Sequence, residues 1–214
     1  MDYKQLVIDS GKKLLHEGFT VETWGNISVR GSDGLVYITP SGMDYDVCTV
    51  DDVVVMDLAG TVMEGTRVPS IEQGLHRAVY LARPEVNAVV HTHPVYSTVF
   101  SAMGENIPLL IDEAAQALGG EVRTAPYALP GSEEIAAGCA AALGKKANAC
   151  LLQSHGAVCV GDSMKAAFKT ARVLEMTAEI YYRIRAVGGR YVPISEANIA
   201  AMQEFVAHRY GQVR

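Results

Sequence analysis

The chain has 214 residues, 49% of them hydrophobic, which suffices for one well-buried domain and is short for two, so we expect a single domain over residues 1–214. A formal net charge of −6 with scattered lysines and arginines provides no basic footprint for nucleic acid or an anionic membrane surface. No apolar stretch approaches the roughly 20 residues that span a bilayer, and the N-terminus lacks a signal-peptide pattern, so the cytoplasm is the expected location. The four cysteines show no C-x-x-C spacing, and we expect them to be buried free thiols.

The first part of the chain is expected to form one helix followed by short antiparallel strands. Residues 2–17 carry apolar side chains at helical spacing and stop at Gly18, which is typical of an amphipathic helix with a glycine C-cap. Ser32-Asp33-Gly34 is a hairpin turn signal. The strands expected around and after this turn are residues 26–30, 35–38, 53–57 and 61–63.

From residue 69 onward, helices and strands are mixed. Ser70 stands at an N-cap position with Gln73 three residues later, so a helix is expected to begin there, to hold Glu72 in its first turn and to run to about Ala82. Residues 107–127 are expected to be rich in loops. The further helices expected are residues 95–102, 132–143, 162–187 and 195–210, and the further strands are residues 86–93, 149–153 and 157–160. With no internal repeat or linker, this pattern predicts an α/β domain that has more hairpins than a regular βαβ array.

Two histidines, His91 and His93, end the apolar run Val-Asn-Ala-Val-Val-His-Thr-His. Side chains alternate across a strand, so these two point the same way, about 7 Å apart, and can hold one metal ion. A neutral imidazole binds Zn, Fe, Co, Ni or Mn without adding charge and leaves the ion a strong Lewis acid. Two ligands do not define a site, and the alternative is a pair of histidines that merely end a strand.

A third histidine, His155, also ends an apolar strand, just before a glycine. If its strand neighbours the one that carries His91 and His93, the three imidazoles can reach one ion. Three protein ligands that leave a position free for water or substrate are typical of catalytic zinc sites, whereas structural sites are closed and usually contain cysteine. The alternative for His155 is a polar residue that caps a strand end.

Glu72 is the carboxylate chosen as general base. It stands near a helix start, where an ionised carboxylate is favoured, and a metal close by would tune its basicity. The alternative is an acid that only complements the helix dipole. His76 lies four residues later and so on the same helical face. It is either a competing metal ligand or a half-buried residue that supports the helix. The remaining two, His16 and His208, have polar neighbours and are expected at the surface.

Three short segments are suited to bind an anion. Glycine lets the backbone approach a ligand, asparagine and serine donate hydrogen bonds, and a helix N-terminus offers free amides. The candidate residues for such a site are Gly25, Asn26, Ser41, Gly42 and Ser70. Each segment taken alone is also an ordinary turn.

Six separated blocks occur in an order that resembles one known family. They are Gly25-Asn26-Ile27-Ser28-Val29-Arg30, Ile38-Thr39-Pro40-Ser41-Gly42, Pro69-Ser70-Ile71-Glu72, Arg83-Pro84 through Val89-Val90-His91-Thr92-His93, Ala125-Pro126-Tyr127 and Leu151-Leu152-Gln153-Ser154-His155-Gly156. As a set they resemble the class II aldolase/adducin family, typified by L-fuculose-1-phosphate aldolase, which also holds ribulose-phosphate 4-epimerases and the adducin head domain. The resemblance covers most of the chain.

The resemblance implies a three-layer α/β/α fold with a central, largely antiparallel sheet flanked by helices, in a C4 homotetramer with active sites between subunits. It implies Zn²⁺, or another divalent metal such as Mn²⁺ or Co²⁺, on His91, His93 and His155, with Glu72 near or on the metal. It also implies that the five anion-binding candidates hold a substrate phosphate. Tyr210, in the segment Arg209-Tyr210-Gly211, resembles a tyrosine that reaches into a neighbouring subunit's site.

The function expected from the resemblance is reversible aldol cleavage of a ketose 1-phosphate, similar to L-fuculose 1-phosphate, into dihydroxyacetone phosphate and a small aldehyde through a metal-stabilised enediolate. Two departures affect the substrate: Ile71 replaces a second serine, and Ile111-Asp112-Glu113 stands near the family's other catalytic tyrosine. Alternatives are a 4-epimerase of the same family, then a dehydratase or decarboxylase of phosphorylated sugars, and lastly a non-enzymatic adducin-like interaction domain.

Overall fold

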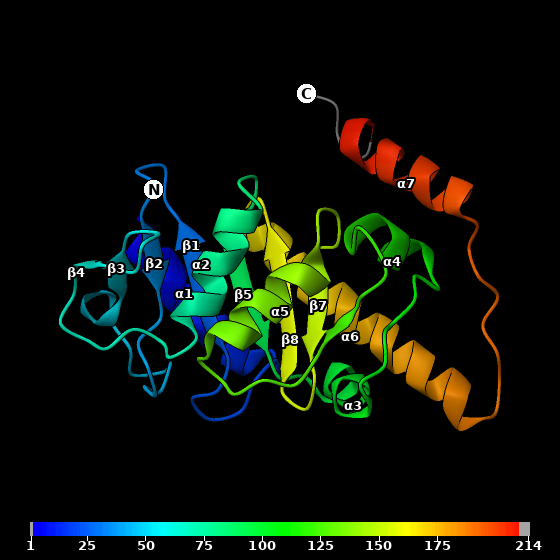
Figure 1. The fold of residues 1–214 in the computed structure, drawn as a ribbon, viewed down its shortest axis with the longest axis horizontal. Helices are drawn as coiled ribbons and strands as arrows, with labels where there is room; N and C mark the ends of the chain where they lie inside the picture. Colours follow the sequence, from blue (N-terminus) through cyan, green and yellow to red (C-terminus); the bar gives the residue numbers. More distant parts are fainter. Residues whose placement is uncertain (1, 210–214) are drawn as a thin grey trace.

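The computed structural model describes residues 2–209, and within them the chain forms one eight-stranded sheet (Figure 1). The strand order is β4-β3-β2-β1-β5-β8-β7-β6, and every neighbouring pair is antiparallel except β6 with β7. The strands are β1 (Asn26–Arg30), β2 (Val36–Ile38), β3 (Val54–Met56), β4 (Val62–Glu64), β5 (Ala88–Thr92), β6 (Thr124–Ala125), β7 (Ala149–Leu152) and β8 (Gly156–Gly161). The expected largely antiparallel sheet is therefore confirmed.

Seven α-helices accompany this sheet in the described part of the chain. They are α1 (Tyr3–His16), α2 (Gln73–Ala82), α3 (Val95–Met103), α4 (Asp112–Ala117), α5 (Glu133–Leu143), α6 (Met164–Ala186) and α7 (Glu196–His208). Of these, only α4 was not expected, and it lies with β6 in the stretch that the sequence indicated as loops. The acids Asp112 and Glu113 in the first turn of α4 are a helix-start signal, but six residues are too few for a clear apolar period.

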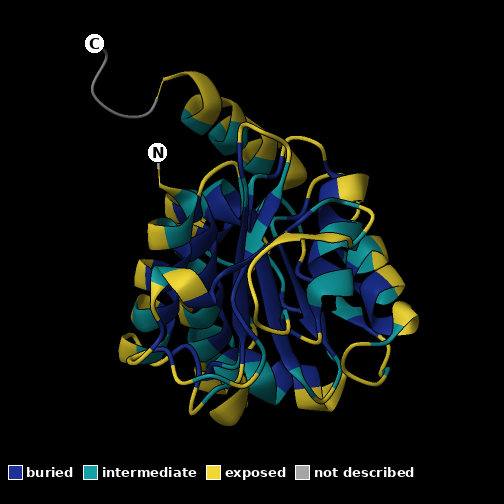
Figure 2. Cartoon of the chain, turned by 90° about the vertical axis from the view of Figure 1, so that its left-hand side faces the viewer, coloured by how far each residue is buried: buried dark blue, intermediate teal, exposed yellow. Residues whose placement is uncertain are grey.

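Each face of the sheet has its own hydrophobic core, because successive strand side chains point to opposite faces. One core contains Leu75 and Val79 of α2 and Ile135 and Cys139 of α5, packed against strand residues that include Val89. The other contains residues of α1, α3, α4 and α6, such as Val7, Phe100, Ala114 and Leu174, packed against Ile27, Ala88 and Val90. In Figure 1, α2 and α5 lie in front of the sheet and α6 behind it, and Figure 2 shows the strands buried between the helices.

Helix α2 begins later than the sequence predicts. Its N-cap is Glu72, and Ser70 lies two residues earlier, where its hydroxyl accepts a hydrogen bond from the Glu72 N–H at 3.3 Å. The backbone explains the difference: Ser70 N donates to Thr39 O at 3.1 Å, next to a bridge between Pro40 and Pro69. This extended pairing keeps Ser70 out of the helix and places both Ser70 and Glu72 beside the Thr39-Pro40 segment.

The strand order brings His155 close to the end of β5, although β8 lies between β5 and β7. β8 pairs directly with β5, with Thr92 opposite Ala157, and β7 lies on the far side of β8. The turn between β7 and β8 carries His155, so the short β7–β8 hairpin returns it towards Thr92. Ser154 in this turn has a left-handed backbone with φ of 55°, which is uncommon for a residue other than glycine.

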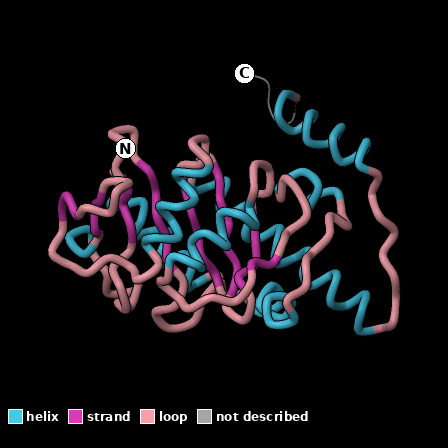
Figure 3. Tube along the Cα trace, viewed as in Figure 1, coloured by secondary structure: helices cyan, strands magenta, loops and turns pink. Residues whose placement is uncertain are grey.

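The C-terminal helix α7 stands apart from the sheet and is joined to α6 by an extended loop (Figure 3). It has no buried residue, and it is linked to the α4 region by Gln203, whose amide donates to Ala115 O and Gly119 O. Tyr210, expected to act in a neighbouring site, lies outside the described residues. The four cysteines are buried and free, as expected, and no helix among residues 2–209 has the length and apolarity to cross a membrane.

The start of α3 is tied to α6 by one carboxylate. Glu175 accepts hydrogen bonds from the backbone N–H groups of Tyr96 and Ser97, each at 2.8 Å, and from the Ser97 hydroxyl at 2.7 Å. A carboxylate at a helix N-terminus satisfies donors that have no partner within the helix and complements its dipole. Since α3 follows His93 after a single proline, this cap also anchors the segment that carries His93.

We therefore expect Glu175→Ala to lower the free energy of unfolding by about 2 kcal/mol, because it leaves buried N–H groups without an acceptor. Urea unfolding followed by circular dichroism measures the loss. The matched control is Glu179→Ala on the same helix, where the carboxylate pairs only with the exposed Arg183 and little change is expected. Equal losses in the two variants would contradict the anchoring role.

Candidate metal centre

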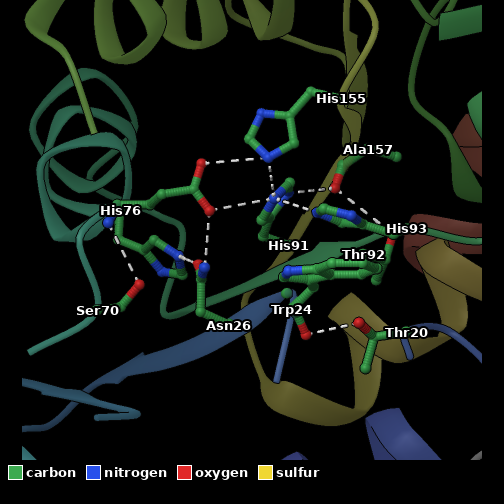
Figure 4. A network of polar contacts seen from close by, with 12 residues as sticks. Thr20, Trp24, Asn26, Ser70, His76, His91, Thr92, His93, His155 and Ala157 are labelled. Atoms are coloured by element: carbon green, nitrogen blue, oxygen red, sulfur yellow. Dashed lines mark hydrogen bonds and ion pairs between the residues drawn. The ribbon is translucent and has the colours of Figure 1, made fainter. Parts of the chain in front are cut away.

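Three histidine side chains converge at the end of β5 (Figure 4). The Nε2 atom of His91 lies 2.9 Å from Nε2 of His93 and 3.2 Å from Nε2 of His155. The ligand atoms of all three lie within 4.8 Å of one another. The structure thus brings together the three histidines that the sequence selected. His93 lies one residue beyond β5, and its backbone N–H is held by Phe19 O at 2.7 Å.

The protonation of His91 follows from its backbone partner. Its Nδ1 lies 3.0 Å from the carbonyl oxygen of Ala157, and because a carbonyl only accepts, Nδ1 carries the proton and Nε2 presents a lone pair. Burial, together with the neighbouring His91, lowers the pKa of His93 to about 3 and that of His155 to about 4. The rings of His93 and His155 are therefore neutral near pH 7, which is the form that ligates metal.

Glu72 completes the cluster from the start of α2. Its Oε2 lies 3.2 Å from His91 Nε2 and accepts a hydrogen bond from the amide of Asn26 at 2.8 Å, and its Oε1 lies 3.6 Å from His155 Nε2. Burial acts to raise the pKa of this carboxyl, but His91, His155 and the Asn26 hydrogen bond outweigh burial and lower it. Glu72 is therefore an ionised, buried carboxylate.

This donor set fits a divalent metal ion. Nitrogens bound tetrahedrally at about 2.0–2.1 Å lie about 3.3 Å apart, close to the separations found between these Nε2 atoms. Neutral rings that turn lone pairs towards one point repel one another unless a cation or proton lies between them. Two buried side-chain atoms here, Glu72 Oε1 and His155 Nδ1, have no hydrogen-bond partner, and a carboxylate oxygen without a partner beside three imidazoles favours a cation.

A cleft of about 510 Å³ opens over this cluster. All five residues that the sequence selected for an anion line it, together with Glu72, His93 and His155. Gly25 is required in its wall because its φ is +72° and a Cβ there would lie 2.8 Å from the His91 carbonyl oxygen. Asn26 differs from the others, because its side-chain amide is already engaged by Glu72 and by His76.

Sequence reasoning missed several contributors to the site. Ser154 and Pro130 line the cleft, and the Ala157 carbonyl orients His91, but none of these carries a local signal because each depends on which segments meet. His76 was expected to be half-buried, yet it is fully buried behind Asn26. His16 is exposed beside Asp46, as expected for a surface residue.

Gly156 leaves the space that the His93 ring occupies. A Cβ on Gly156 would lie 2.4 Å from Thr92 O and 2.9 Å from Cδ2 of His93, closer than real Cβ contacts. The glycine after His155 therefore permits β8 to pair closely with β5 while His93 turns towards the other two rings. Glycine inside a strand often marks such a close approach.

Comparison with known proteins agrees with this geometry. The sequence model of the family described as "Class II Aldolase and Adducin N-terminal domain" matches residues 5–182. The chain therefore belongs to the class II aldolase and adducin family, whose enzymes use a divalent metal.

Individual relatives match over most of their length. The chain is 36% identical over 186 residues to the 5-deoxy-D-ribulose 1-phosphate aldolase of Bacillus thuringiensis, covering 86% of each chain. It is 40% identical over 178 residues to the 5-methylthioribulose-1-phosphate/5-deoxyribulose-1-phosphate aldolase of Rhodospirillum rubrum, covering 83% of this chain and 79% of the relative. A solved L-fuculose 1-phosphate aldolase aligns with a TM-score of 0.90 at 36% identity and covers 95% of both chains.

Gly156→Ala is expected to weaken the binding of a divalent metal, assayed with Zn²⁺, by about 10- to 100-fold, because the added methyl displaces the His93 ring or separates β5 from β8. Titration against a chromophoric chelator measures the affinity. Gly138→Ala in α5 is the matched control, since its new Cβ would meet only Ala125 at an ordinary 3.6 Å. Zinc affinity unchanged by Gly156→Ala would show that His93 does not contribute to the site.

Proposed function

We propose that this protein is a metal-dependent lyase that reversibly cleaves a ketose 1-phosphate into dihydroxyacetone phosphate and a small aldehyde. The observation that carries the proposal is the placement of a three-histidine cluster and an ionised carboxylate beside a cleft that also holds the hydroxyl and glycine segments suited to phosphate. Family membership and the names of the relatives agree with an aldolase.

His91, His93 and His155 would hold Zn²⁺, or Mn²⁺ or Co²⁺ in its place, with Glu72 as a further ligand when no substrate is present. When bound, the ion supplies Lewis-acid polarisation of the substrate's carbonyl and hydroxyl oxygens. The fixed tautomer of His91 keeps its lone pair towards this position, and the buried surroundings keep the other two rings neutral.

Glu72 moves the proton. In the synthetic direction, its carboxylate removes a proton from the hydroxymethyl carbon beside the carbonyl of dihydroxyacetone phosphate. That carbon then forms a bond to the aldehyde carbon, and the aldehyde oxygen takes up a proton from solvent to become a hydroxyl. In the cleavage direction, this hydroxyl gives its proton to solvent as the carbon–carbon bond breaks, and Glu72 returns a proton to the carbon. A buried base that is ionised at neutral pH and lies beside the candidate metal position suits this role.

The phosphate would be bound by hydroxyls and backbone amides from Gly25, Ser41, Gly42 and Ser70. No lysine or arginine among the described residues lines this cleft, so the donors that this subunit offers to the anion are neutral. The Ser70 hydroxyl accepts from the Glu72 N–H, which leaves its own proton free for a phosphate oxygen. Asn26 follows Gly25 in this loop, and its side-chain amide donates to Glu72, so it links the phosphate-binding loop to the base.

We propose a substrate that ends in a deoxy carbon. The relatives act, by their names, on 5-deoxyribulose, 5-methylthioribulose and fuculose 1-phosphates. Supporting this, Trp24 in the cleft wall is 58% exposed and offers apolar surface to a methyl-bearing aldehyde. Ile71 stands at the position where the fuculose enzymes are expected to carry a second serine, so the phosphate site has one hydroxyl fewer.

Assembly is part of the proposal. We propose a homotetramer with active sites between subunits, in which Tyr210 approaches a neighbouring site, and a three-layer α/β/α arrangement within each subunit. The separate cores on the two sheet faces support the layers, and the absence of any buried residue in α7 supports a neighbouring surface that covers it. A 4-epimerase is the second candidate, because it would use the same metal and the same carbon–carbon cleavage.

Glu72→Gln is expected to abolish exchange of the dihydroxyacetone phosphate proton with solvent while metal remains bound, because the amide cannot accept the proton. Proton NMR in deuterium oxide follows the exchange, and metal analysis checks the site. Glu134→Gln, at an exposed carboxylate in the first turn of α5, serves as the control. Retained exchange in Glu72→Gln would refute the assignment of the base.

A coupled assay for dihydroxyacetone phosphate across a panel of ketose 1-phosphates is expected to give the highest kcat/KM with a deoxy sugar. A strong chelator should abolish the activity, and Zn²⁺ or Mn²⁺ should restore it, because the Lewis acid is essential to the reaction. Cleavage that persists in the chelator would contradict the proposed mechanism. Inversion of the substrate without release of aldehyde would favour the epimerase.

A further inference from the structure

Behind Glu72, a set of polar side chains is buried between α2 and β1. Glu72, His76 and Tyr80 recur every four residues along α2, and Asn26 and Ser28 occur two residues apart on β1. All five are at most 6% exposed. Four helical residues rise about 6 Å and two strand residues about 6.6 Å, so the two rows stay in register as they pass each other.

Hydrogen bonds join these side chains into one continuous chain. Tyr80 OH lies 2.7 Å from Ser28 Oγ, which lies 2.6 Å from His76 Nδ1. His76 Nε2 lies 2.5 Å from Asn26 Oδ1, and Asn26 Nδ2 lies 2.8 Å from Glu72 Oε2. Figure 4 shows His76 and Asn26 side by side next to the histidine cluster.

The direction of each hydrogen bond follows from the contact between Asn26 and Glu72. The Asn26 amide nitrogen donates to Glu72 Oε2, so the Asn26 oxygen faces His76. His76 Nε2 therefore carries a proton. The His76 side chain is fully buried, which favours its neutral form, and its Nδ1 accepts from the Ser28 hydroxyl. Ser28 in turn accepts from Tyr80.

This arrangement treats the two oxygens of Glu72 differently. Oε2 is held by Asn26, whereas Oε1 is buried without a hydrogen-bond partner. An oxygen that already accepts a hydrogen bond is less basic, while the unpartnered oxygen is the better proton acceptor. The orientation of Asn26 thus decides which oxygen is available.

We propose that His76 is a positioning residue for the reaction: as its neutral Nε2–H tautomer, it locks the Asn26 amide so that Oε2 of Glu72 is held and Oε1 is the oxygen that moves the substrate proton. The assignment of the proton transfer rests on the proposed function, but the tautomer and the orientation of Asn26 do not. The inference also removes the Asn26 side chain from the set of phosphate-binding groups, because its amide nitrogen is bonded to Glu72 and its amide oxygen to His76.

Three variants test the role of His76 in turnover. His76→Leu removes both hydrogen bonds at similar volume and is expected to lower kcat by about 10- to 100-fold, with KM and metal content within about twofold of wild type. His76→Gln keeps an N–H donor near the position of Nε2 and is expected to restore kcat to within about threefold. Tyr80→Phe removes only the outermost hydroxyl, so it should leave kcat within about threefold, since Ser28 still donates to His76.

The kinetic outcomes separate positioning from a structural role. A loss of kcat that Gln does not rescue, or equal losses in His76→Leu and Tyr80→Phe, would show that the polar cluster matters only for packing. A rise in KM with unchanged kcat would place Asn26 on the phosphate and overturn the proposal. Circular dichroism and zinc stoichiometry verify that each variant is folded and loaded.

A measurement without turnover tests the tautomer in the zinc-loaded protein. Nitrogen-15 NMR of the imidazoles, with His76 assigned by the signals that disappear in His76→Gln, should show a protonated Nε2 and an unprotonated Nδ1 at pH 7. A protonated Nδ1 would overturn the proposal, because Asn26 could then not be held in this orientation. If the wild-type protein cleaves no ketose 1-phosphate, the proposed function fails, whereas this spectrum still decides the orientation of Asn26.

Discussion

The antiparallel register of β5 against β8 is the constraint on which the candidate site depends. With Thr92 opposite Ala157, the β7–β8 turn places His155 beside the two histidines that end β5, and the Ala157 carbonyl fixes the tautomer of His91. A slip of one residue would turn every side chain of β8 to the other face and remove that carbonyl from reach. The backbone pairing of two strands therefore determines both the position of His155 beside the pair and the tautomer of His91.

A second constraint is the match between a helix and a strand. Because α2 and β1 advance by similar distances over four and two residues, one row of helix side chains can contact one row of strand side chains without interruption. Polar groups at such an interface must find partners. From Tyr80 to Asn26 they do, and along this row the buried atom without a partner is Glu72 Oε1, beside the candidate metal cluster. The polar row is therefore satisfied up to the carboxylate that faces the histidines.

Local patterns predicted most of the elements. Apolar period and caps located the helices other than α4 and the strands other than β6, because these segments are long enough for their period to be read. The start of α2 was misplaced, since Ser70 and Gln73 satisfy the local rule for a helix start, while pairing of Ser70 with Thr39 overrides it. A competing backbone partner that is distant in sequence leaves no mark on the local pattern.

By itself, the sequence determined which side chains could ligate a metal, that His91 and His93 share a direction, and which family the ordered blocks resemble. The first two inferences depend on residue type and on spacing along one strand, and the third depends on the order of blocks along the chain, so all of them can be read without the fold. Only the tertiary structure decided that the β7–β8 turn places His155 next to His91 and His93. It also decided that Asn26 holds Glu72, and that His76 lies behind Asn26 and outside the candidate metal cluster. Those contacts join residues 46 to 64 positions apart in the chain, so strand register and helix placement fix them.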